Sequence, residues 1–145
     1  MALAIAHYIH VVLVGVWLGF LVGGLAVSRA GPRALLEYHR SYGLIALASL
    51  LLAGFVGLYL ATFYGGPGEW FRFGEPSGRI GEKMVSYLVL LVLGGYLQHR
   101  IVPRLEGGGG DAVRSYRIAA SVTLLITLAT MLLGTSIVKG GFLAG

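Results

Sequence analysis

The chain has 145 residues, of which 57% are hydrophobic and only 12% are charged, and it contains no cysteine. A soluble domain carries about a quarter charged residues, so the composition excludes an ordinary soluble protein and indicates an integral membrane protein. Without cysteine there is no disulfide, thiolate metal site or cysteine-held iron–sulfur cluster, and any metal chemistry must use histidine.

Four apolar stretches are long enough to cross a membrane as helices, since a helical span needs roughly 20 residues. They cover residues of about 3–27, 41–64, 84–102 and 118–138, and the connections between them are too short for a soluble domain. The sequence has no alternating strand pattern. We therefore predict one all-α domain, residues 1–145, folded as an integral membrane antiparallel four-helix bundle that contacts the lipid bilayer.

The first stretch carries a face with ionisable and aromatic side chains. Residues spaced by three and four share one stripe of a helix, and this stripe consists of His7, His10, Val14, Trp17, Leu21 and Gly24. An ionisable side chain within a span is costly, usually faces the interior of the bundle and marks a functional site. His10 is therefore the leading candidate to bind a metal or cofactor. The alternative is a histidine that only hydrogen-bonds to a neighbouring helix.

Small residues mark packing faces in the first and fourth stretches. Where side chains are missing or short, another membrane helix can approach closely. The first stretch has a glycine at every fourth position, namely Gly15, Gly19 and Gly23. The fourth has a face of Thr123, Thr127 and Thr130. We expect close helix packing at both faces, and the glycine face also suits association with a second copy of the chain.

The second and third stretches hold the remaining histidines. Pro32 suits the first turn of a helix, so the second helix should begin before it enters hydrocarbon. This places His39 at the membrane interface, beside Tyr38 and Tyr42. His99 lies near the inner end of the third stretch. Because consecutive helices are antiparallel, we expect His39 and His99 to be able to face each other as ligands; the alternative for His39 is a solvated, ligand-free side chain.

Depth separates the histidines into two sets. At 1.5 Å per residue, His10 lies about 7 Å to the outer side of its span's centre, and His99 about 10 Å to the inner side of its own. One metal ion cannot hold both. The outer set is His7 and His10, with Lys83 at the start of the third helix, and the inner set is His39 with His99.

Basic residues are distributed unequally between the two ends of the predicted bundle. Seven arginines flank the first and third connections, against four basic residues on the other side. Cytoplasmic loops carry the excess of Lys and Arg in membrane proteins. We therefore predict a multi-pass protein of the plasma membrane with both termini outside. The net charge of +5 reflects this topology, and we expect no nucleic-acid partner.

The available donors suit either haem or copper. A compact copper site is most natural at His7 and His10, three residues apart on one helix, with Met84 as a further ligand. A haem needs one ligand, or two from facing helices, and an apolar slot lined by small residues. One haem b at His10, a second between His39 and His99, and copper all remain open at this point.

The spacing His10-x6-Trp17-x-Gly19 in a first membrane helix resembles the CopD copper-resistance family and the related HemJ-type protoporphyrinogen oxidases. Lys83, in the segment EKMVSYLVLLVL, is similar to the lysine that opens a corresponding helix in those proteins. The chain length and the four-span layout are also similar to HemJ. The resemblance implies a b-type haem served by His10 and Lys83, with Trp17 beside it. The segment SRAGPRALLEYH and the position of His99 depart from the HemJ pattern.

Three functions follow from these interpretations. The leading hypothesis is a membrane-embedded b-type haem-binding protein with a redox, electron-transfer role, whose partner is a quinone, a porphyrin or a redox protein. If it is an enzyme, it is an oxidoreductase, and the HemJ resemblance implies protoporphyrinogen oxidation. The second hypothesis is copper binding or transport of the CopD type. The third is an accessory structural subunit whose histidines hydrogen-bond within the bundle.

Overall fold

The computed structural model describes residues 1–63, 66–71 and 78–142, with side chains for 1–63, 66–71 and 80–132. Four long helices dominate this part of the chain: α1 (Ala2–Val27), α2 (Pro32–Ala61), α3 (Gly78–Tyr96) and α5 (Gly110–Phe142). A π turn (Leu97–Ile101) and the short α4 (Val102–Leu105) continue α3. The described residues contain no strand, which confirms the all-α prediction.

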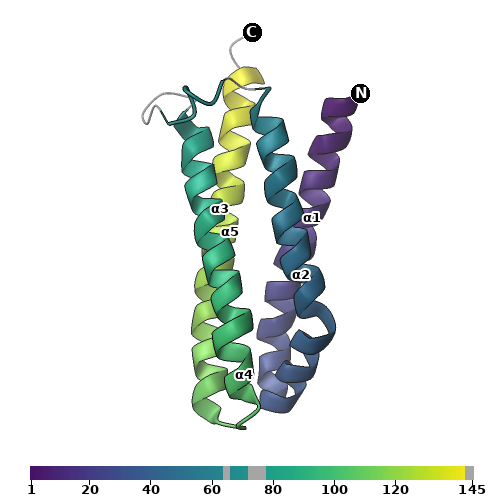
Figure 1. Cartoon of the computed structure of the whole chain (residues 1–145), viewed down its shortest axis with the longest axis vertical. Coiled ribbons are helices and arrows are strands. Elements are labelled where there is room, and N and C mark those ends of the chain that lie inside the picture. Colours follow the sequence, from purple (N-terminus) through teal and green to yellow (C-terminus); the bar gives the residue numbers. More distant parts are fainter. Residues whose placement is uncertain (64–65, 72–77, 143–145) are drawn as a thin grey trace.

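The helices form an up-and-down bundle, in which α1 begins and α5 ends at the same end (Figure 1). We call this the outer end, after the predicted topology, and the opposite end, where α1 turns into α2 and α4 into α5, the inner end. Four helical segments in the described residues are long and apolar enough to cross a membrane: Ala2–Ala30, Pro32–Ala61, Ile80–Leu105 and Gly110–Leu132. The fold is that of a multi-pass membrane protein.

The helices extend beyond the apolar stretches that predicted them. Pro32 stands in the first turn of α2, as expected, and Gly31, with φ of 105°, separates this helix from a 3-10 turn (Ser28–Ala30). The polar start of α2 remains helical because Ala, Leu, Glu and Arg are good helix formers in or out of lipid. Hydropathy marks only the part of a helix that can lie in hydrocarbon, so the apolar stretch of 41–64 begins later than α2, as Pro32 predicted.

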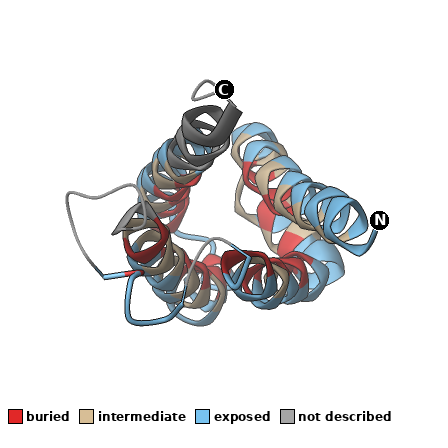
Figure 2. Cartoon of the chain, turned by 90° about the horizontal axis from the view of Figure 1, so that it is seen from above, coloured by how far each residue is buried: buried red, intermediate tan, exposed pale blue. Residues whose placement is uncertain are grey.

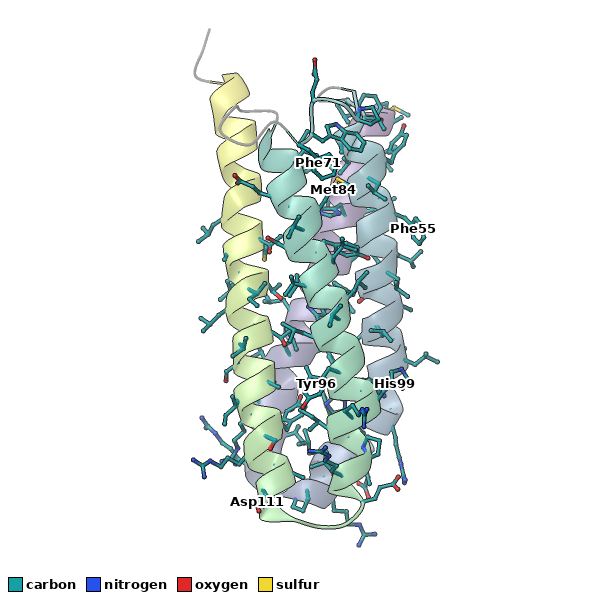
Figure 3. The ribbon with its side chains drawn as sticks, turned by 60° about the vertical axis from the view of Figure 1, so that its left-hand side comes forward. Phe55, Phe71, Met84, Tyr96, His99 and Asp111 are labelled. Carbon is teal, nitrogen blue, oxygen red and sulfur yellow. The ribbon has the colours of Figure 1, made fainter. Side chains whose placement is uncertain are left out.

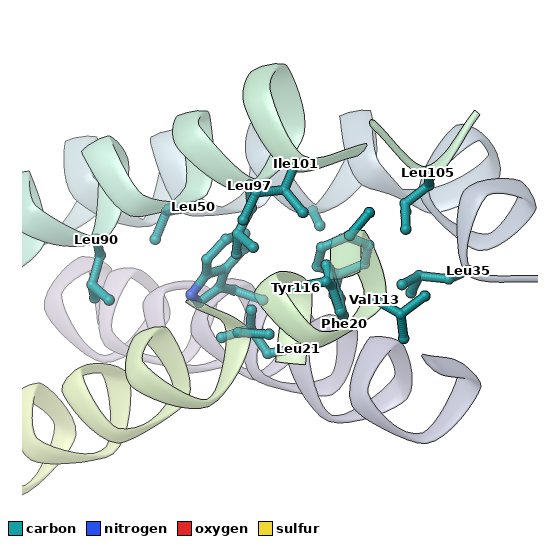
Figure 4. Close-up of a cluster of buried hydrophobic side chains, with 14 residues drawn as sticks. Phe20, Leu21, Leu35, Leu50, Leu90, Leu97, Ile101, Leu105, Val113 and Tyr116 are labelled. Atoms are coloured by element: carbon teal, nitrogen blue, oxygen red, sulfur yellow. The ribbon is translucent and has the colours of Figure 1, made fainter. Parts of the chain in front are cut away.

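Buried residues lie on the inward faces of the helices, and exposed residues lie on the outward faces (Figure 2). The predicted stripe of α1 supplies its buried face, which includes Trp17, Leu21 and Gly24. Trp17 donates a hydrogen bond from Nε1 to Oγ1 of Thr127 at 3.3 Å. Thr127 belongs to the predicted packing face of α5 and is 2% exposed. Figure 4 shows the resulting cluster of apolar side chains between the four long helices.

Several glycines provide the space for these contacts. A Cβ on Gly24 would collide with the Tyr116 hydroxyl, and one on Gly54 would collide with the ring of Tyr87. The predicted glycine face of α1 is divided: Gly23 lies against the Tyr38 hydroxyl, whereas Gly15 and Gly19 have no described atom within 4 Å of a Cβ position. Within one chain, this face is therefore a packing surface only at its inner end.

Candidate functional site

His10 is half-buried in the outer half of α1 and is anchored to α2. Its Nδ1 lies 2.9 Å from the carbonyl oxygen of Ala53. A carbonyl oxygen only accepts, so Nδ1 carries the proton and Nε2 keeps a free lone pair. Metal-ligating histidines almost always hold their second ring nitrogen in such a bond, which fixes both the tautomer and the ring orientation. His10 therefore has the geometry of a prepared ligand.

Residues of α2 and α3 surround the His10 side chain. On α2, a Cβ at Gly57 would lie 3.2 Å from His10 Cε1, so the missing side chain lets the imidazole rest against the helix. On α3, the half-buried Lys83 lies close enough to His10 to interact electrostatically. Lys83 has no ion-pair or hydrogen-bond partner among the residues that the structure describes. The outer site thus combines one oriented imidazole with a lysine that has no acidic partner among the described residues.

The remaining outer candidates do not complete a compact metal site. His7 is exposed one turn nearer the outer end. Met84 packs against the small cluster of Ala61, Trp70 and Ile80 (Figure 3). Across the described part of the chain, no three His, Cys, Asp or Glu side chains come together in a way that could hold a metal ion. Of the predicted copper set of His7, His10 and Met84, only His10 is hydrogen-bonded to a neighbouring helix within the described part of the chain.

The inner half of the bundle contains a second histidine in a very different setting. His39 on α2 is 1% exposed and lies at the centre of three aromatic rings. Its ring centroid is 4.9 Å from that of Phe20, 5.1 Å from that of Tyr116 and 6.0 Å from that of Tyr38, all edge-on. Its Nδ1 donates to Oε1 of Gln98 at 3.0 Å. We call this group of five residues the inner cage.

Two expectations about the inner histidines differ from the structure. His39 is buried within the bundle and is not a solvated side chain, because the inward face of α2 runs through Leu35, His39 and Gly43. His99, in contrast, is exposed on the bundle surface (Figure 3). The structure brings Gln98, one residue earlier in the π turn, to His39 instead. The two imidazoles predicted to pair are thus in separate environments.

The two sites differ in how well they suit a haem. At the outer site, one anchored imidazole has a free Nε2 beside a lysine, and this donor chemistry suits a haem held by a single axial ligand. At the inner site, the rings of Phe20, Tyr38 and Tyr116 occupy the space around His39. These inner residues do not fit a haem.

No protein-family model, curated protein or solved structure matches the chain. The likeness to CopD and HemJ proteins therefore consists of the two short segments around His10 and Lys83. Function has to be argued from the geometry of the two sites.

Proposed function

We propose that the chain is a membrane-embedded b-type haem-binding protein with a redox role, in which His10 is the axial ligand. The observation that carries this proposal is the bond from His10 Nδ1 to the Ala53 carbonyl, which leaves Nε2 available in an otherwise apolar helix. A bound haem would supply one-electron chemistry, and the protein would supply its position, axial ligand and shielding from water.

Particular residues of the chain would orient the axial ligand and bind the haem's carboxylates. The Ala53 carbonyl orients the imidazole, and Gly57 leaves room for the imidazole itself against α2. Lys83 supplies a positive charge suited to a carboxylate, such as a haem propionate. An electron partner that dissolves in lipid, such as a quinone or a porphyrin, would approach from the membrane, and an activity of this kind would make the protein an oxidoreductase.

The donor set favours haem over copper. A haem already has four nitrogen ligands of its own and can be held by one histidine, as in globins. A protein copper site must supply its ligands from side chains. The described residues offer a single anchored imidazole at the outer site and no group of three His, Cys, Asp or Glu side chains that could hold a metal ion. One observation does favour an accessory structural subunit: His10 and His39 are both hydrogen-bonded to neighbouring helices.

The haem content of the purified protein separates these candidates. We expect a red protein with about one haem b per chain by the pyridine haemochrome method, because only the outer site fits the group. Its Soret band should sharpen and shift on reduction. A colourless protein that copurifies with copper would favour the CopD-type alternative, and one with neither cofactor would favour the accessory subunit. A ratio near two would contradict our assignment of the inner cage.

The orientation in the membrane can be tested by cysteine labelling, since the chain has no cysteine of its own. We propose that both termini face outside the plasma membrane, because the excess of arginine lies at the inner end. Gly68→Cys should then react with an impermeant maleimide added to intact cells. Ser41→Cys and Gly108→Cys should react only after the cells are opened. The reverse pattern would overturn the orientation without affecting the fold.

The open part of the glycine face suits association between two copies of the chain. Gly15 and Gly19 are exposed and have no described atom near them, although most glycines along the bundle interior lie against side chains. Such glycine pairs, four residues apart, allow two membrane helices to approach closely. We propose that any homo-oligomer forms through Gly15 and Gly19, without Gly23, because Tyr38 covers that position.

A further inference from the structure

We propose that the inner cage binds one water molecule, which links His39 to Tyr116 and completes a hydrogen-bonded chain from Gln98. The proposal concerns the inner half of the bundle and does not depend on haem binding at His10. It rests on two buried polar atoms that belong to neighbouring rings.

His39 Nε2 and the hydroxyl oxygen of Tyr116 are both fully buried, and neither has a hydrogen-bond partner among the described residues. Tyr116 is 0% exposed and His39 is 1% exposed. Their rings are neighbours, with centroids 5.1 Å apart and planes at 86°. Buried polar atoms in proteins almost always have a partner, in the protein or in ordered water. Because His39 and Tyr116 pack against each other and each has an unpartnered buried atom, we infer that the two atoms share one ligand.

The hydrogen-bonding roles of the two atoms are complementary. His39 Nδ1 donates to Gln98, so Nε2 can only accept. The Tyr116 hydroxyl can donate. A water molecule can donate to Nε2 while it accepts from Tyr116, which satisfies both atoms at once. Buried waters typically make two to four such bonds, so these two partners meet the minimum.

The surroundings of the two atoms are tightly packed. A Cβ at Gly24 would collide with the Tyr116 hydroxyl, so α1 must present a glycine beside this group. The rings of Phe20 and Tyr38 lie edge-on to His39. A groove of about 160 Å³ that these two rings help to line includes neither His39 nor Tyr116. Both residues are at most 1% exposed, so a water between them would be held away from bulk water. The described residues contain no group of three His, Cys, Asp or Glu side chains that could hold a metal ion instead.

The chain of bonds would join three helices at one level of the membrane. Gln98 comes from the π turn after α3, His39 from α2 and Tyr116 from α5. Single π turns inside α-helices are frequent at functional sites. Here the turn presents Gln98 to His39, which fixes the tautomer of the imidazole and leaves Nε2 as the acceptor for water.

Nitrogen-15 NMR of the whole protein in lipid bilayers tests the proposal. With histidine labelled, magnetisation should pass from exchangeable water protons to the unprotonated Nε2 of His39, identified as the resonance that a His39→Gln variant lacks. In Tyr116→Phe this transfer should be lost or reduced several-fold, since the water would keep only one partner. Tyr87→Phe is the matched control, because its hydroxyl bonds the carbonyl of Leu50 elsewhere in the bundle, and it should leave the His39 signal unchanged.

Each outcome decides the question. Absence of water transfer to His39 Nε2 in the unmodified protein would overturn the proposal, even if no variant folds. Equal transfer in Tyr116→Phe would also overturn it, because Tyr116 would then not hold the water. Transfer that disappears in Tyr116→Phe and persists in Tyr87→Phe would support it, whatever the haem content of the protein.

Discussion

Replacing His10 by alanine should abolish haem binding. His10 supplies the only anchored imidazole of the outer site, and alanine has no group that could replace Nε2. Loss of an outer-shell partner alone typically costs a metal site about 10–100-fold in affinity, so loss of the ligand itself should cost about 100-fold or more. The purified His10→Ala protein should therefore lack the Soret band and contain little haem by the pyridine haemochrome method.

His7→Ala provides the matched control for this experiment. It removes the same side chain from the same helix, one turn nearer the outer end, where the imidazole is exposed. This variant should keep its haem and a normal reduced spectrum. A full haem complement in His10→Ala would disprove the ligand assignment. Equal loss in both variants, with both still folded by size-exclusion chromatography, would indicate that the two histidines act together.

The general fold followed from hydropathy and helical periodicity. Four spans of sufficient length predicted the four long helices, and the spacing of Trp17, Leu21 and Gly24 predicted the face of α1 that is buried. These signals are local: a span must be apolar along its length, and side chains three or four apart share a face whatever the helix packs against. The sequence also indicated that His10 lies on the inward stripe of α1.

The choice of residues at the inner cage could not be predicted in the same way. Successive side chains on a helix point about 100° apart. The rotation of this helical segment about its own axis therefore decides whether Gln98 or His99 faces His39. That rotation depends on the π turn at Leu97–Ile101, which has no clear signal in the sequence. Tyr116 was missed because one aromatic residue near the end of a span usually belongs to the interfacial belt. Only the packed bundle shows that it is fully buried.

The glycines illustrate the same limit. Spacing alone placed Gly15, Gly19 and Gly23 on one face, but it could not say which of them has a neighbour within the chain. Only Gly23 has one, the Tyr38 hydroxyl, because α2 reaches α1 at the inner end. On α2, Gly54 and Gly57 do have close neighbours from other helices, Tyr87 and His10 respectively.

Gly54 is a position where a single added methyl group should disturb the packing between two helices. Its missing side chain admits the ring of Tyr87 from α3. The Tyr87 hydroxyl then donates to the carbonyl oxygen of Leu50 at 2.9 Å, which ties α3 to α2. An added Cβ would occupy the position of the ring, so Tyr87 would have to leave and its hydrogen bond would break.

We expect Gly54→Ala to destabilise the protein by about 1–3 kcal/mol, the usual cost of forcing an extra carbon into a packed core. Gly95→Ala is the matched control, since it lies inside α3 with no described atom within 4 Å of a Cβ position, and alanine is the better helix former. The fraction of protein that stays monodisperse after heating in detergent should fall at a lower temperature for Gly54→Ala and remain at or above the original midpoint for Gly95→Ala. Equal midpoints for the two variants would show that Tyr87 does not pack against Gly54 in the membrane protein.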